Sequence, residues 1–446
     1  MQEGQGPRRV SLSFFDLVNL VVGAVIGADV YIVTGPGAAR LGPALLVAWI
    51  VGGVLAGCIS LCFAQCAAIV TTAGGPYAYV EAALGRWPAR FVGWALYLAE
   101  WAALPVFPVA AIPYVATLVH LDPRGEAAFK IAFIAFFLIT NLIGVQTAGR
   151  VNDVLTVGKL LPLAVLVATA LVLLTRSPGL GAARLTPFAP FGWGRFDVAL
   201  ILVFWAYAGF EVASLPSEAI ADPRVTLPRA ILLGMAIATA FYLLTNLAAF
   251  LAVPWPEMTR APAPLARALG AALEDVGLPP ILGVILMTAG AVVSIAGVNE
   301  AVMLGASQLA ARLAAREDLP AFLAHQNRAF GTPDLALLAQ AASALIAAVL
   351  LDLTRLIEIA VFFLVLVYLA TVIAAALLVR RYPERRLRVP ALSAFIALAA
   401  LGTALLGGSI KGHSIILGVG LLTAVGSGST ACRLLRPARS GTRGRS

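Results

Sequence analysis

The chain has 446 residues, of which 61% are apolar and only 12% are charged. A typical soluble protein carries about 25% charged residues, and a soluble domain this apolar could not cover its surface with polar groups. Disorder is excluded as well, because disordered chains combine few apolar residues with many charges. The composition predicts an all-α polytopic membrane protein, whose length allows about twelve helices at about 20 residues per span.

The formal net charge of +9 does not indicate a nucleic-acid partner. The basic residues are spread over many short loops, with modest clusters at Arg380–Arg388 and Arg433–Arg445, and they form no basic face with interleaved aromatic residues. Charge of this kind sets the topology of a membrane protein and contacts lipid headgroups. We therefore expect membrane lipid, and no nucleic acid, as a partner.

Neither the histidines nor the cysteines predict a metal site or another cofactor. All 3 histidines lie at or beyond the expected span ends, so they do not form the buried pairs that hold a haem. Cys58, Cys62 and Cys66 form one stripe on an apolar helix, with no evident histidine or carboxylate partner for a metal. Small residues at a helix–helix contact explain this stripe better.

Apolar runs between polar or Pro/Gly breaks predict about twelve membrane helices. They are expected at residues 14–39, 43–70, 88–119, 127–146, 153–175, 196–216, 228–253, 278–305, 334–352, 355–379, 390–408 and 413–434. With the N-terminus inside, the inner segments carry 20 Lys and Arg residues and the outer loops carry 10. Because inner loops are enriched in positive charge, this asymmetry predicts an inner-membrane protein with both termini in the cytoplasm.

Two of these spans contain features that an unbroken membrane helix avoids. The first reads Gly23-Ala-Val-Ile-Gly27-Ala-Asp29, and the sixth reads Phe204-Trp-Ala-Tyr-Ala-Gly-Phe-Glu211. Glycine weakens a helix by about 1 kcal/mol, and a carboxylate near mid-membrane costs about 2.5–3.5 kcal/mol. Such costs persist where unwound backbone lines a polar cavity. Paired interruptions in corresponding spans predict an inverted-repeat transporter, whose freed N–H and C=O groups hold a small charged substrate.

Three further ionisable side chains, Glu100, Lys159 and Glu300, fall inside predicted spans. Lys159 is flanked by apolar residues and lies too deep to reach the interface easily. A desolvated lysine can exchange a proton near neutral pH, and a static ion pair with Asp29, Glu100 or Glu300 is the alternative. Glu100 and Glu300 can also simply face neighbouring helices.

Six short strings, in this order, resemble the amino acid–polyamine–organocation (APC) transporter superfamily. They are Gly23-Ala-Val-Ile-Gly27, Gly74-Gly-Pro-Tyr-Ala-Tyr79, Val157-Gly-Lys-Leu-Leu-Pro162, Phe204-Trp-Ala-Tyr-Ala-Gly-Phe-Glu211, Glu218-Ala-Ile-Ala-Asp-Pro-Arg224 with Leu227-Pro-Arg229, and Ala315-Arg-Glu-Asp-Leu-Pro320. Each string is weakly specific, but six in order over residues 14–320 are strongly indicative.

The resemblance implies a LeuT-like fold of five plus five inverted helices with two appended helices. On this basis, residues 1–13 form an N-terminal tail and residues 14–380 form the transport core, with repeats at about 14–175 and 196–380. Residues 390–434 form the appended helices, and residues 435–446 form the C-terminal tail.

The resemblance also implies a substrate site where spans one and six unwind. Its expected residues are Val25, Ile26, Gly27, Ala28, Asp29, Trp205, Ala206, Tyr207, Ala208 and Phe210. The N–H groups of Gly27, Ala28 and Asp29 would hold a carboxylate. An ammonium group would bind the carbonyls of Val25, Trp205, Ala206 and Ala208, and Tyr207 or Phe210 would act as an aromatic gate.

Lys159 matches the span-five lysine that takes the place of a sodium ion in proton-coupled members of the superfamily. Ser294 would be its neighbour. Together with Glu100, Glu211 and Glu300, these residues are the candidates for proton coupling or ion pairing.

Asp29 departs from the superfamily pattern, which usually has glycine at this position. A carboxylate here would repel the carboxylate of a substrate. Either Asp29 points away or pairs with a cation, or the substrate presents an amine to it. Asp29 and Glu211 could then hold a diamine through charge-assisted hydrogen bonds.

These observations predict a secondary active transporter for amino acids, driven by protons or by exchange. A polyamine or organic-cation antiporter is the alternative, and a ligand-binding sensor with a transporter fold is a further one. An intramembrane enzyme is not expected, because the chain has neither an H-E-x-x-H nor a G-x-S-x-G motif.

Overall fold

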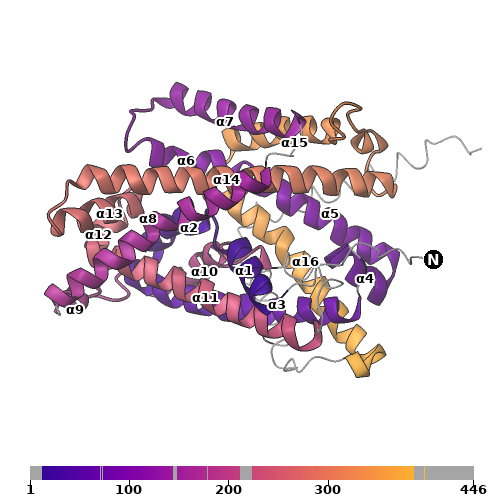
Figure 1. Ribbon diagram of the computed structural model, residues 1–446, viewed down its shortest axis with the longest axis horizontal. Coiled ribbons are helices and arrows are strands. Elements are labelled where there is room, and N and C mark those ends of the chain that lie inside the picture. Colours follow the sequence, from indigo (N-terminus) through magenta and orange to yellow (C-terminus); the bar gives the residue numbers. More distant parts are fainter. Residues whose placement is uncertain are drawn as a thin grey trace, which may run out of the picture.

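The computed structural model describes residues 13–70, 72, 74–143, 148–177, 179–210, 223–385 and 396, and of residues 148–158 and 223–225 it describes only the backbone. The regular elements in these ranges are helices (Figure 1). The α-helices are α1 (Phe14–Val25), α2 (Asp29–Leu41), α3 (Leu45–Ile69), α4 (Pro76–Leu84), α5 (Arg86–Ala103), α6 (Val106–Val115), α7 (Pro123–Ile143), α8 (Ala148–Arg176), α9 (Leu180–Arg184), α10 (Phe196–Trp205), α11 (Pro223–Ala252), α12 (Trp255–Met258), α13 (Pro264–Asp275), α14 (Pro280–Ala315), α15 (Asp334–Leu350) and α16 (Leu353–Arg381). The short 3-10 helices are η1 (Gly42–Ala44), η4 (Ala321–Ala324) and η5 (Pro383–Arg385).

The long apolar helices fall where the apolar runs predicted membrane spans, and the shorter helices α4, α9, α12 and α13 lie between predicted spans. Seven segments of the described ranges are long and apolar enough to cross a membrane: Asp29–Ile69, Arg86–Val115, Pro123–Ile143, Lys159–Arg176, Thr226–Ala252, Pro280–Ala315 and Leu353–Arg381. The shorter apolar helices α10 and α15 lie in two other predicted spans, and α1 lies in the first predicted span, 14–39, ahead of α2. The last two predicted spans, 390–408 and 413–434, lie outside the described residues except for residue 396. The prediction of a polytopic helical protein is confirmed for the described part of the chain.

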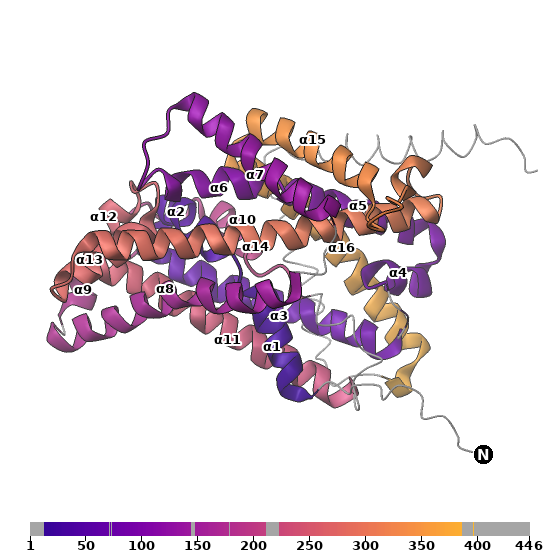
Figure 2. The same cartoon turned by 45° about the horizontal axis from the view of Figure 1, so that its top comes forward.

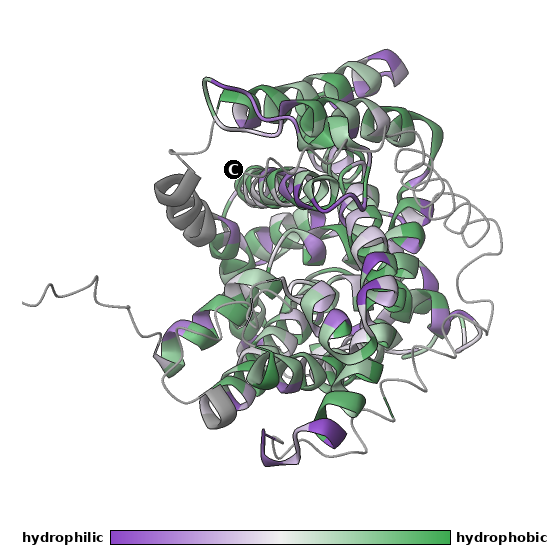
Figure 3. Ribbon diagram, turned by 90° about the vertical axis from the view of Figure 1, so that its right-hand side faces the viewer, coloured by the Kyte–Doolittle hydropathy of each residue, from purple (hydrophilic) through white to green (hydrophobic). Residues whose placement is uncertain are grey.

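The broken spans lie inside the bundle. Helices α7 and α15 pack side by side along one edge, and α3 and α11 pack along the opposite edge (Figures 1 and 2). Helices α2 and α10 lie between these two edges, and α1 packs against α11 at the lower edge (Figure 2). Apolar residues cover most of the helical surface, and hydrophilic residues lie largely in connecting segments and at helix ends (Figure 3). Large side chains such as Phe136 and Leu350 are 60% and 73% exposed. In a bilayer they would contact acyl chains instead of water.

The third predicted span, 88–119, is not one continuous helix. It consists of α5 and α6, which are separated at Leu104 and Pro105. Proline has no N–H to continue the helical hydrogen bonds. The eighth predicted span, 278–305, is shorter than the observed helix, because α14 continues without interruption to Ala315.

Two of the strings that carried the superfamily resemblance meet at one end of the bundle. Asp318 is fully buried, and its carboxylate lies 2.6 Å from Nε of Arg90 on α5. The hydroxyl of Tyr77 on α4 donates to the other carboxylate oxygen at 3.0 Å. The indole N–H of Trp94 donates to the Asp318 carbonyl at 2.6 Å. These bonds tie the segment after α14 to α4 and α5.

Candidate functional site

The first predicted span is interrupted, as its glycine and carboxylate indicated. Helix α1 ends at Val25, and α2 begins at Asp29. Ile26 has an extended conformation, with φ of −76° and ψ of 92°. A Cβ on Gly27 would lie 3.1 Å from Oδ2 of Asp29 and 3.2 Å from Cγ2 of Val298, so the interruption is closely packed. Its N–H groups at 27–29 lie at the start of α2, where a helix carries partial positive charge. The Gly27 N–H interacts with the Tyr242 hydroxyl, and the Asp29 N–H interacts with the carboxylate of the same residue.

The sixth predicted span is interrupted as well. Helix α10 ends at Trp205, and three tight turns follow, in which the N–H groups of Ala206, Tyr207 and Ala208 each bond to the carbonyl three residues earlier. Gly209 then has φ of +108°, a conformation that favours glycine. Glu211 lies outside the described residues.

The two interruptions are in direct contact. A Cβ on Gly209 would lie 2.6 Å from the carbonyl oxygen of Ala24 and 3.8 Å from the backbone nitrogen of Val25. The end of α1 therefore packs against the segment after α10, and glycine is the residue that permits this approach.

Tyr242 on α11 links the two interruptions. Its hydroxyl lies 2.7 Å from the carbonyl oxygen of Val25 and 3.0 Å from that of Ala206. These are two of the four carbonyls expected to bind an ammonium group, and a third, on Trp205, accepts from the Ala208 N–H. A carbonyl oxygen has two lone pairs, so each retains capacity for a ligand. The sequence analysis did not single out Tyr242. The sequence feature that could have indicated it is a polar stripe of Tyr242, Thr245 and Asn246 within the seventh predicted span.

Asp29 is buried and does not project away from the interruption. Its Oδ2 lies over Gly27, in the position just described. Lys159 on α8 acts on Asp29 electrostatically, although among the described residues the two side chains do not approach closely enough to form an ion pair.

The other candidate coupling residues occupy separate environments. Ser294 on α14 is 2% exposed, and its hydroxyl has no hydrogen-bond partner among the described residues. Glu300, one and a half turns further along α14, faces α7 and accepts a hydrogen bond from Thr140 at 3.1 Å. Glu100 lies in the last turns of α5 and is partly buried. The environment of Glu300 matches the alternative in which it faces a neighbouring helix.

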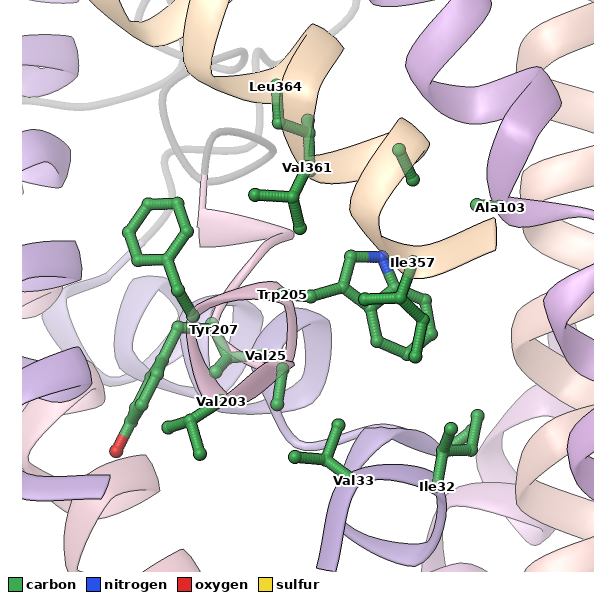
Figure 4. Close-up of a cluster of buried hydrophobic side chains, with 14 of the residues drawn as sticks. Val25, Ile32, Val33, Ala103, Val203, Trp205, Tyr207, Ile357, Val361 and Leu364 are labelled. Atoms are coloured by element: carbon green, nitrogen blue, oxygen red, sulfur yellow. The ribbon is translucent and has the colours of Figure 1, made fainter. Parts of the chain in front are cut away.

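The aromatic residues after α10 point in different directions. Tyr207 donates to the carbonyl of Trp49 on α3 at 2.8 Å. Phe210 packs against Phe63 on α3 and Tyr368 on α16, with centroid distances of 5.5 and 5.3 Å. Figure 4 shows Trp205 projecting to the opposite side from Tyr207. Of the expected aromatic residues, Trp205 is therefore the one that faces the apolar group around α2 and α16.

That apolar group borders both interruptions. Ile32 and Val33 in the first turns of α2 and Ile357 and Val361 on α16 surround Trp205 (Figure 4). These four aliphatic side chains are between 0% and 3% exposed. A side chain of a ligand held at the interruptions would meet a hydrocarbon wall here.

Comparisons with known proteins agree with this architecture. Residues 12–420 match the sequence profile of a family described as amino acid permease. The chain is 27% identical to the methylthioribose transporter of Bacillus subtilis over 343 residues, which is 72% of this chain and 71% of that protein. It is 27% identical to the branched-chain amino acid permease BcaP of Bacillus subtilis over 290 residues, 61% of each chain. It is 29% identical to an uncharacterized transporter of Mycobacterium tuberculosis over 415 residues, 93% of this chain and 90% of that protein.

The family and these relatives are permeases and transporters, not enzymes. The chain spans a membrane several times, and its family implies a small-molecule substrate such as an amino acid. It belongs to the amino acid permease family of the amino acid–polyamine–organocation superfamily.

Proposed function

We propose that the chain is a secondary active transporter that moves amino acids across the cytoplasmic membrane by alternating access. The observation that carries this proposal is the contact between the two interruptions, which Tyr242 bridges. The interruptions bring N–H donors at the start of α2 and carbonyl acceptors at the ends of α1 and α10 into one place. A zwitterion requires both kinds of group, and discontinuous membrane helices supply them.

The aliphatic wall supports an amino acid with an apolar side chain as substrate. A polyamine would bring a second ammonium group against Ile32, Val33, Ile357 and Val361, where burial without a partner is costly. The relative BcaP is named a branched-chain amino acid permease, and branched-chain amino acids have apolar side chains of this class. Asp29 supports the alternative, a polyamine or organic-cation antiporter, because its buried carboxylate could pair with an amine.

We further propose that Lys159 couples transport to protons. It lies inside a membrane span and acts electrostatically on Asp29, at the start of α2. Loss of its proton would remove the positive charge near Asp29 and change which arrangement of α2 is favoured. Exchange of one substrate for another is the alternative driving force.

The membrane topology is part of the same proposal. We propose a five-plus-five inverted repeat with two appended helices, about twelve in total, and cytoplasmic termini. The excess of Lys and Arg in the segments assigned to the inside, 20 against 10, supports this orientation.

Uptake into proteoliposomes tests the function. Leucine, valine, methionine, lysine and putrescine would be offered under imposed proton or sodium gradients, each with substrate exchange as a separate condition. Proton-driven or exchange-driven accumulation of apolar amino acids is expected. Accumulation of putrescine alone would establish the antiporter alternative, and binding without flux of any compound would identify a sensor.

A further inference from the structure

Two buried tyrosines connect three helices through their hydroxyl groups. Tyr114 on α6 donates to the backbone carbonyl of Tyr31 on α2 at 2.8 Å. Tyr31 in turn donates to the backbone carbonyl of Lys159 on α8 at 2.6 Å. The two rings meet edge to face with centroids 6.0 Å apart, and each residue is 2% exposed. The backbone of α8 at Lys159 is therefore tied to the half-helix that follows the first interruption.

The packing around this tie leaves little room for independent movement. A Cβ on Gly290 of α14 would overlap Pro162 of α8 and would lie 3.2 Å from the Tyr31 hydroxyl. Pro162 follows Lys159 by three residues and has no N–H to donate within α8. Helix α8 thus lacks the bond from residue 162 to the Gly158 carbonyl, and the Tyr31 hydroxyl donates to the next carbonyl along the chain, that of Lys159.

The first turn of α2 contacts Lys159 in two ways. Asp29 acts on its ammonium group, and Tyr31, two residues later, bonds to its backbone carbonyl. Among the described residues, Asp29 is the charged side chain that acts on Lys159. From α11, the Tyr242 hydroxyl lies on the Val25 and Ala206 carbonyls, and from α14 the surface against Pro162 is Gly290. A change in the charge of Lys159 would therefore act on α2 first.

We infer that Tyr31 is a positioning residue that transmits the charge state of Lys159 to α2 and so to the first helix interruption. This inference rests on the proposed role of Lys159 in proton coupling. The electrostatic interaction between Asp29 and Lys159 provides the force. The Tyr31 hydrogen bond provides the mechanical link, since its hydroxyl lies 2.6 Å from the Lys159 carbonyl oxygen and Tyr31 itself is 2% exposed. Without the link, Lys159 still gains and loses its proton, but the position of α2 no longer changes with the charge of Lys159.

The substitution Tyr31→Phe removes the hydroxyl and retains the ring. Uptake would be measured in proteoliposomes from mildly acidic to neutral pH, together with the equilibrium affinity for the same substrate. Couplings between sites typically change affinities or populations about 5- to 150-fold. We expect wild-type uptake to vary at least about fivefold over this pH range, and the variant to lose most of that dependence while its affinity stays within about threefold of wild type. Tyr382→Phe, which removes a hydroxyl from a side chain 39% exposed, is the matched control.

Lys159→Ala separates failure of the inference from failure of the proposed function. If Lys159→Ala abolishes the pH dependence and Tyr31→Phe retains it, the role of Tyr31 is refuted and that of Lys159 stands. If Lys159→Ala also keeps a wild-type pH dependence, the coupling role of the lysine is refuted, and the role of Tyr31 with it. Should Tyr31→Phe not give monodisperse protein, Tyr31→Leu, which also removes the hydroxyl, replaces it. A lost pH dependence then supports the role of Tyr31, and a retained one refutes it.

Discussion

The hydroxyl oxygen of Tyr242 lies 2.7 Å from the carbonyl oxygen of Val25, the last residue of α1. The same hydroxyl lies 3.0 Å from the carbonyl of Ala206, the first residue after α10. One side chain of α11 thus sets the spacing between two helix ends that are 181 residues apart in the sequence (206 − 25). Because Tyr242 is fully buried, no bulk water is available to replace these bonds.

The substitution Tyr242→Phe should impair both stability and transport. It leaves two buried carbonyl groups without this donor, at a cost of about 1–3 kcal/mol. We expect a lower unfolding temperature in detergent and at least about tenfold slower uptake, since about 1.4 kcal/mol corresponds to a factor of ten. The Tyr382→Phe variant controls for loss of an exposed hydroxyl. Wild-type uptake by Tyr242→Phe would show that the bridge is unimportant.

A methyl group at Gly209 should separate the two interruptions. Gly209→Ala places a Cβ 2.6 Å from the Ala24 carbonyl oxygen and forces alanine to adopt φ of +108°. Left-handed conformations cost an alanine about 1–2 kcal/mol, before the steric overlap is counted. Uptake should therefore fall strongly.

The matched control for this variant is Gly23→Ala, because a Cβ at Gly23 would meet nothing within 4 Å. Gly23 lies within α1, where alanine is favoured over glycine by about 0.5–1 kcal/mol. Equal losses of uptake in the two variants would contradict a specific role for the contact at Gly209.

Replacement of Asp29 should discriminate between the two substrate classes. Asp29→Gly removes the carboxylate that lies over Gly27 and within the field of Lys159. If the substrate is an amino acid, its carboxylate is no longer repelled, and the apparent KM should fall or remain unchanged. If the substrate is a polyamine, a charge partner is lost and uptake should drop at least about tenfold, as expected for a bond to a charged group worth about 1.5–3 kcal/mol. Competition assays with leucine and putrescine distinguish these outcomes.

The buried ion pair at one end of the bundle should be required for stability. Asp318→Ala leaves Arg90, which is 6% exposed, without its carboxylate partner. Loss of one member of a buried pair typically costs about 3–5 kcal/mol, so the unfolding temperature in detergent should decrease clearly. Glu257→Ala removes the partner of Arg267 in a pair whose side chains are 51% and 49% exposed, and it should cost only about 0–1 kcal/mol. Similar shifts for both variants would argue against a stabilising role for the buried pair.

The sequence allowed the helices and the two interruptions to be predicted, because both depend on local composition. Apolar runs mark the spans, and glycine beside a carboxylate, at Gly27 with Asp29 and at Gly209 with Glu211, marks places where a membrane helix is weak. The bridging role of Tyr242 could not be predicted in the same way. This role depends on how α11 crosses α1 and α10. The polar stripe of α11 alone does not indicate which backbone carbonyls the Tyr242 hydroxyl contacts.

Other features required the three-dimensional structure for the same reason. Val298 of α14 lies as close to Gly27 as the Asp29 carboxylate does, and only folding brings it there. The strings around Tyr77 and Asp318 were recognised separately, but only folding brings them within 3.0 Å. Helix α13, which packs against α14 at Gly283, was not expected, because its short amphipathic sequence lies between two predicted spans.

A structure of the protein determined with its transported substrate tests the central claim most directly. Electron cryo-microscopy would be carried out with the compound that drives uptake most strongly in proteoliposomes. We expect substrate density in contact with the backbone at residues 27–29 and 205–208, with its side chain toward Trp205 and Ile357. Substrate density at another place, with the two interruptions closed on each other, would contradict a binding site between the broken helices.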